Sequence, residues 1–178
     1  QFTFNDLTTK GPITAIRIEG SKNSIDERIK QLINELALDK KEISILDPEQ
    51  SNIFWEKTRS LNVFSSLKNN LLRIIVPGSE AFDLINKLKI YNIKYFIDWG
   101  GNLVWVQLDQ LNSSILKEIK TIVKNLGGYL TVIKADESLK VSIDIFTIDE
   151  VKYKISEKIK KSFDPKRILN PGKMYIGI

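Results

Sequence analysis

The chain of 178 residues contains no cysteine and no histidine. Without cysteine, disulfides, iron–sulfur clusters and thiol catalysis are excluded, and residence in the reducing cytosol is permitted. Without histidine, the chain lacks the commonest general base and the usual zinc ligand. These two absences remove the side chains on which most proton-transfer and metal sites depend.

Long apolar runs are also absent. The stretch 71–76 is interrupted by Arg73 and is far shorter than the ~20 residues that a membrane span needs, so the sequence predicts a protein without a transmembrane segment. No signal peptide is visible at the start. The chain begins with Gln1 rather than Met, which leads us to expect a fragment of a longer protein.

The net charge of +5 comes from lysines dispersed among acidic residues, with a local excess over residues 152–161. An RNA-binding sheet of this size would show an aromatic-rich strand with an Arg/Lys-Gly-aromatic pattern, and none is present. The charge therefore indicates a solvated surface, and no nucleic-acid partner is expected.

From residue 71 onward the hydrophobic pattern alternates between strand and helix periods. A Gly-Gly-Asn hairpin signal and a Gly-Gly helix stop separate the segments. The expected elements are strands at 71–76, 94–99, 103–108 and 129–134 and helices at 79–90 and 112–126. This order is the split β-α-β plan of ferredoxin-like folds.

The first third carries part of the same plan. The pattern predicts strands at 2–5, 13–19 and 43–46 around a helix at 24–38. The predicted fold is therefore α+β and ferredoxin-like: two split β-α-β half-repeats share one antiparallel sheet, with helices on one main face. Further helices are expected at 52–61 and 151–163, and residues 136–146 are expected to form a loop.

Two prolines and a glycine shape the C-terminal end. Asp164-Pro165 ends the basic helix, because the residue before a proline avoids the α conformation. In Asn170-Pro171-Gly172, the proline stiffens the backbone and the glycine permits a close approach. The Asn170 amide can then offer two donors and one acceptor to a planar polar partner. The alternative is an ordinary C-terminal tail.

Residues 163–173 resemble the C-terminal run of the FAD-linked oxidases of the vanillyl-alcohol-oxidase type. Residues 54–59, 72–77 and 97–102 resemble segments that occur in the same order in the second flavin-linked component of bacterial glycolate oxidases. The family's N-terminal FAD-binding domain, with its Gly-rich loops, has no counterpart here. The resemblance implies that residues 1–163 form a cap domain, and that the tail 164–178 returns to that missing domain.

The resemblance also implies a function. The chain would be the C-terminal domain of a FAD-linked subunit of a glycolate (D-2-hydroxyacid) oxidase or dehydrogenase complex, closing the flavin site and contacting the other subunits. The full-length protein would hold FAD, with Asn170, Pro171 and Gly172 at the flavin. A cytoplasmic location, or membrane association through the complex, would follow. The isolated chain is expected to bind neither flavin nor metal and to be inactive.

Arg59 is the candidate substrate-binding residue. In related D-2-hydroxyacid dehydrogenases an arginine after a helix tryptophan holds the substrate carboxylate, since its planar fork suits bidentate binding. Arg59 follows Trp55 by four residues and hence lies on the same helix face. The alternative is a structural contact of the guanidinium with the indole.

No catalytic residue is assigned. The related catalytic subunits carry histidines that bind a metal and take the substrate proton, whereas the matching stretches here, 101–104 and 131–136, contain none. Asp98 or Asp136 could be proposed as the base, but acidic residues at turn edges are more typical of caps or solvated positions. Trp99 and Trp105, which flank the Gly-Gly turn, are expected to share a face and pack a core.

Two other functions stay open. A flavin-free ferredoxin-like module could bind a small molecule on its sheet or an acidic partner through its lysines. A free-standing enzyme is disfavoured by the lack of histidine, cysteine and any phosphate-binding loop. The coding region upstream of Gln1 distinguishes the oxidase domain from the flavin-free module, because a Gly-rich FAD domain is expected only for the oxidase.

Overall fold

A computed structural model describes residues 2–4, 7–9, 12–39, 43–62, 64, 70–173 and 175–176. The chain forms two compact units, Gln1–Ser65 and Ser66–Ile178, here called unit 1 and unit 2. The expected division into a domain of residues 1–163 and a tail of residues 164–178 stays a prediction.

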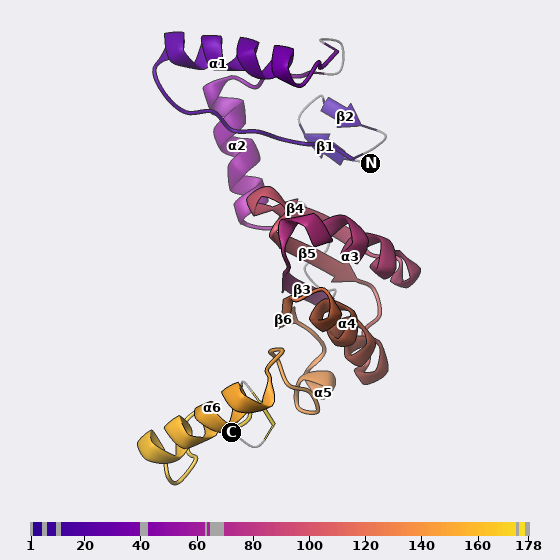
Figure 1. Ribbon diagram of the computed structural model, residues 1–178, viewed down its shortest axis with the longest axis vertical. Coiled ribbons are helices and arrows are strands. Elements are labelled where there is room, and N and C mark those ends of the chain that lie inside the picture. The colour runs from indigo at the N-terminus through magenta and orange to yellow at the C-terminus, as the bar shows by residue number, and fades with distance from the viewer. Residues whose placement is uncertain are drawn as a thin grey trace. The chain divides into compact units, whose positions relative to one another are not determined.

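Unit 2 is built around a four-stranded antiparallel sheet with the order β4-β5-β3-β6. Its strands are β3 (Asn70–Ile75), β4 (Lys94–Asp98), β5 (Leu103–Leu108) and β6 (Tyr129–Lys134). Helix α3 (Ala81–Leu88) connects β3 to β4, and α4 (Ser113–Asn125) connects β5 to β6. Figure 1 shows both helices on the same face of this sheet. The predicted α+β class and the split β-α-β order are confirmed.

The core lies between the sheet and these two helices. Alternate strand residues point into it because side chains alternate across a pleated strand, so Leu72 and Ile74 of β3 are fully buried. The helices contribute apolar residues at helical spacing, including Leu84 and Leu88 of α3 and Ile119 of α4. The apolar stripes predicted on both helices are thus the faces that they bury.

The turn between β4 and β5 requires glycine. Gly100 and Gly101 have φ of +60° and +100°, in the region that favours glycine. A Cβ on Gly101 would stand 3.0 Å from the carbonyl oxygen of Gly78 in the short 3₁₀ turn η2 (Gly78–Glu80). Asn102 joins the two turns by accepting a hydrogen bond from the Gly78 N–H at 3.1 Å.

Helix α4 ends in a Schellman motif. The N–H of Gly127 donates to the Lys124 carbonyl, and the N–H of Gly128 donates to the Val123 carbonyl at 2.8 Å. A Cβ on Gly128 would stand 2.5 Å from Val76 Cγ1 and 2.6 Å from the Ile75 carbonyl oxygen. The second glycine is therefore required by the contact between the end of α4 and β3.

Unit 1 differs from the prediction. Its strands, β1 (Phe2–Phe4) and β2 (Leu7–Thr9), form a two-stranded sheet of their own, so the two half-repeats do not share one sheet. The predicted strands at 13–19 and 43–46 are not formed in their described residues. Ile16 and Ile45 are 57% and 64% exposed. Apolar residues without a neighbouring strand cannot complete the ladder that a strand needs.

The helices of unit 1 are α1 (Lys22–Glu35) and α2 (Pro48–Arg59). Asp47 and Gln50 form a capping box at the start of α2, and Pro48 occupies the first helical turn. In unit 2, a short helix α5 (Glu137–Lys140) occupies part of the predicted loop 136–146, and α6 (Glu150–Phe163) follows it.

Candidate functional site

Asp164 organises the turn that follows α6. It lies at the C-cap and is buried, with one oxygen accepting from the Ile168 N–H at 3.1 Å and the other from the Leu169 N–H at 2.9 Å. Lys160 forms an ion pair with the same carboxylate at 2.8 Å and also donates to the Leu169 carbonyl. Asp164 therefore folds the chain back along α6, in addition to ending the helix before Pro165.

These partners change the titration of the carboxyl group. The hydrogen bond from Lys160, supported by the backbone N–H groups of Leu169 and Ile168, lowers the pKa of Asp164 from 3.8 to about 2. All of these donors favour the ionised form.

The stabilisation of this turn should depend on pH in a defined direction. A depressed pKa in the folded state means that the contribution is fully present above the unfolded pKa of 3.8 and is lost as the pH falls through about 2. We expect the amide resonances of Ile168 and Leu169 to titrate with a midpoint near pH 2, and Asp164→Asn to abolish that titration. We call the hydrogen bonds and the ion pair at this carboxylate the Asp164 clamp. A midpoint near the ordinary value of 3.8 would contradict it.

The predicted flavin-contacting residues lie on the turn after this clamp. Asn170, Pro171 and Gly172 are all exposed. Asn170 adopts φ of +46°, which asparagine tolerates better than most residues, and its carbonyl accepts from the Lys173 N–H at 3.3 Å. Gly172 has φ of +68°. The structure thus holds the three residues in one solvent-facing turn.

The far end of the tail is attached to the rest of unit 2. Tyr175 is buried against Phe146 and Tyr153, with ring centroids 6.1 and 5.9 Å away. The Ile176 N–H donates to the Asp144 carboxylate at 2.8 Å. The backbone carbonyl of Asp144 accepts from Lys120 of α4 at 2.5 Å, and burial lowers the pKa of this lysine. The exposed turn is therefore fixed on both sides.

Helix α6 presents a second, apolar surface. We call four apolar residues of α6 at intervals of four the α6 stripe: Val151, Ile155, Ile159 and Phe163. Their side chains are 68%, 53%, 54% and 83% exposed, respectively. Ile168 and Leu169 in the following turn are 71% and 60% exposed. Exposed apolar patches are a common feature of interaction surfaces.

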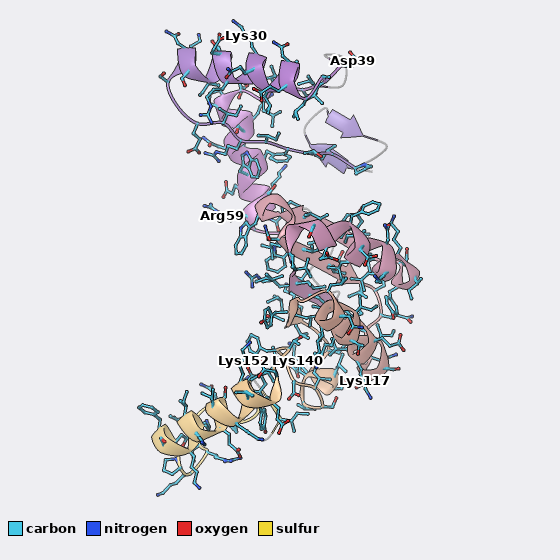
Figure 2. All side chains as sticks on the ribbon, in the orientation of Figure 1. Lys30, Asp39, Arg59, Lys117, Lys140 and Lys152 are labelled. Atoms are coloured by element: carbon cyan, nitrogen blue, oxygen red, sulfur yellow. The ribbon has the colours of Figure 1, made fainter. Side chains whose placement is uncertain are left out.

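Arg59, the predicted substrate-binding residue, is exposed at the C-terminal end of α2 (Figure 2). It lines a hollow of about 450 Å³ within unit 1, together with Trp55 of the same helix. The prediction that Trp55 and Arg59 share one helix face is therefore consistent with their common position in this hollow.

Trp99 was expected to pack a core with Trp105, and this expectation is wrong for Trp99. Its side chain is 58% exposed because the residue lies in the turn after β4, at φ of +54°, rather than in the ladder. The guanidinium of Arg73 lies 5.4 Å from its ring centroid. Arg73 also pairs with Trp105 across β3 and β5, so the three residues gather on the sheet face opposite the core.

The two carboxylates considered as bases behave differently. Asp98 accepts from the Trp99 N–H at 2.7 Å and caps the short turn Trp99–Gly101, as expected of a turn-edge carboxylate. Asp136 precedes α5 without a side-chain cap. Within the described ranges, no group of three or more acidic residues is placed to hold a metal ion. None of the described helices has the length and apolar character required to cross a membrane.

The C-terminal segment is similar to a known family. Residues 146–174, which comprise α6, the Asp164 clamp and the exposed turn, match the family of FAD linked oxidases, C-terminal domain. The resemblance to FAD-linked oxidases that was predicted from the sequence is thereby confirmed.

A curated relative is glycolate oxidase subunit GlcE of Escherichia coli (strain K12). It is 26% identical to this chain over 162 residues, which represent 90% of this chain and 38% of the relative. The chain thus spans well under two thirds of the length of the relative that it matches, and the relative contains a large region with no counterpart here.

Proposed function

We propose that this chain is the C-terminal domain of a FAD-linked subunit of a glycolate (D-2-hydroxyacid) oxidase or dehydrogenase complex. In that protein the domain closes the flavin site and contacts partner subunits. The location that follows is cytoplasmic, or membrane-associated through the complex.

One observation carries the proposal. The segment that matches the FAD-linked oxidases is held in place by contacts within unit 2, and it exposes a set of apolar side chains to solvent. Asp164 and Tyr175 hold the tail against α6, while the α6 stripe and the Asn170 turn face solvent. Burial of exposed apolar side chains lowers the free energy, so a surface of this kind is suited to contact with a neighbouring domain.

The exposed turn fits one edge of a flavin. The Asn170 amide supplies donors and an acceptor for a planar polar ring edge, and Ile168 and Leu169 add apolar surface beside it. Pro171 and Gly172 keep the turn free of bulky side chains. FAD, when bound, supplies the acceptor for the hydride that leaves a 2-hydroxyacid. The pyrophosphate would have to be held by the flavin-binding domain.

Arg59 is proposed to bind the substrate carboxylate. Arg59 lies at the end of α2, in a hollow beside the Trp55 indole. Its guanidinium can donate two parallel hydrogen bonds to the oxygens of a carboxylate. The proton acceptor for the reaction is assigned to no residue of this chain.

The proposal is tested by Asn170→Ala in the full-length protein. We expect weaker retention of FAD, or slower flavin reduction by glycolate, because hydrogen bonds at the domain junction are lost. The melting temperature of this chain alone should fall only slightly, by the strain of placing alanine at the positive φ of residue 170 in an exposed turn. FAD content after gel filtration and stopped-flow absorbance measure the first two quantities.

Asn125→Ala is the matched control, because Asn125 is also exposed but lies at the end of α4. It should leave FAD retention unchanged. If Asn170→Ala unfolds the isolated chain and leaves the FAD content untouched, Asn170 is a structural residue. If the full-length protein holds no flavin, the flavin-free binding module becomes the better assignment.

A further inference from the structure

The hollow in unit 1 contains a second guanidinium. It is lined by Arg17, Asn52, Trp55, Glu56 and Arg59. Four of these residues belong to α2, whereas Arg17 comes from the segment before α1, where residues 12–19 form no helix or strand. Two arginines distant in sequence thus line one open hollow.

The Arg17 side chain is oriented by local contacts. Its Nε lies 2.6 Å from Glu19 Oε1, and the Glu19 backbone carbonyl accepts from Arg28 of α1 at 3.2 Å. A guanidinium carries five N–H donors in a planar fork, so a contact at Nε leaves the terminal nitrogens to bind another group. Glu19 therefore acts as the positioning residue for Arg17.

The charge of the lining limits the ligand. The two guanidinium groups are opposed by two carboxylates, that of Glu56 in the lining and that of Glu19, which pairs with Arg17, so little net positive charge is left for a ligand. A monoanion is therefore favoured over a dianion, whose second charge would be left uncompensated. The Trp55 indole provides an apolar wall, and the Asn52 amide provides a donor and an acceptor for a neutral polar group.

We propose that Arg17 and Arg59 together bind a small monocarboxylate in this hollow, and that Arg17 is a specificity-determining residue. The inference deepens the role proposed for Arg59 and rests on it. It does not depend on flavin, because binding is measured on this chain alone.

The test follows the guanidinium Nε–H resonances of the labelled chain by NMR during titration with sodium glycolate at low ionic strength. We expect saturable shifts at Arg17 and Arg59 and none at Arg73 or Arg167 of unit 2. Arg17→Lys and Arg59→Lys should each weaken binding about tenfold, since lysine keeps the charge but loses the fork. Arg167→Lys is the matched control and should bind as the unaltered chain does.

Malonate, with two carboxylates, should bind more weakly than glycolate, and sodium chloride at equal ionic strength should give no saturable shift. The inference is overturned if all arginines shift together with ionic strength, if Arg17→Lys binds glycolate normally, or if malonate binds as tightly. Thermal unfolding of each variant confirms that it is folded. If the chain does not bind glycolate but Asn170→Ala still loses FAD, the proposed carboxylate binding in the hollow is refuted and the flavin assignment stays in place.

Discussion

Gly128→Ala is expected to lower the free energy of unfolding of the chain by about 3 kcal/mol, the upper part of the usual range for overpacking. The added methyl group would lie 2.5 Å from Val76 Cγ1, 2.6 Å from the Ile75 carbonyl oxygen and 3.0 Å from Val123 Cγ1. Ile75 ends β3, and Val76 is the buried residue that follows it. The end of α4 would therefore have to move away from the sheet. Urea unfolding followed by circular dichroism measures the change.

Gly127→Ala is the matched control for this experiment. Its φ of +69° disfavours a side chain, but no heavy atom lies within 4 Å of the Cβ position. Only backbone strain is introduced, which costs about 1 kcal/mol. Equal effects at the two neighbouring glycines would show that backbone conformation, rather than the close approach of α4 to β3, determines the result.

The second large effect is expected for the double substitution Ile155→Glu and Ile159→Glu on the α6 stripe. In the full-length protein it should reduce FAD retention by at least about tenfold, because each buried isoleucine contributes roughly 1.5–3 kcal/mol to a contact. In this chain alone, both side chains are about half exposed, so the melting temperature should not fall. Gel filtration with flavin absorbance, and thermal unfolding, give the two measurements.

Lys117→Glu controls for charge, since it changes the net charge by the same two units on the exposed surface of α4 (Figure 2). It should leave FAD retention unaltered. If the double α6 variant also keeps its FAD, the stripe is not part of the contact with the flavin-binding domain. If the variant destabilises the isolated chain, the stripe has a structural role within unit 2.

The fold of unit 2 was predictable because its signals are local. The sequences of its strands either alternate apolar and polar residues or form short apolar runs. Its helices carry complete apolar stripes that end at glycine or a turn. Unit 1 was predicted less well. Its expected strands, such as 13–19, have the right composition, but a strand forms only where a partner lies beside it, and composition does not supply the partner.

The candidate site was predictable only in part. The Asn170 turn and the shared face of Trp55 and Arg59 follow from proline, glycine and helical spacing. Arg17 was missed because an irregular segment has no periodicity to indicate which way its side chains point. The Asp164 clamp did have a sequence signal, since Lys160 stands four residues before a carboxylate at the helix end.

The attachment of the tail at Asp164 and Tyr175 affects how fast and how tightly this segment can associate. Fixing the backbone of one residue costs about 1–2 kcal/mol, and a disordered tail would meet that cost at the moment of binding. Here the residues from Asn170 to Lys173 are already confined between two anchored points. The docking that we propose for this turn would therefore require no coupled folding step, and we expect it to have the kinetics of two preformed surfaces.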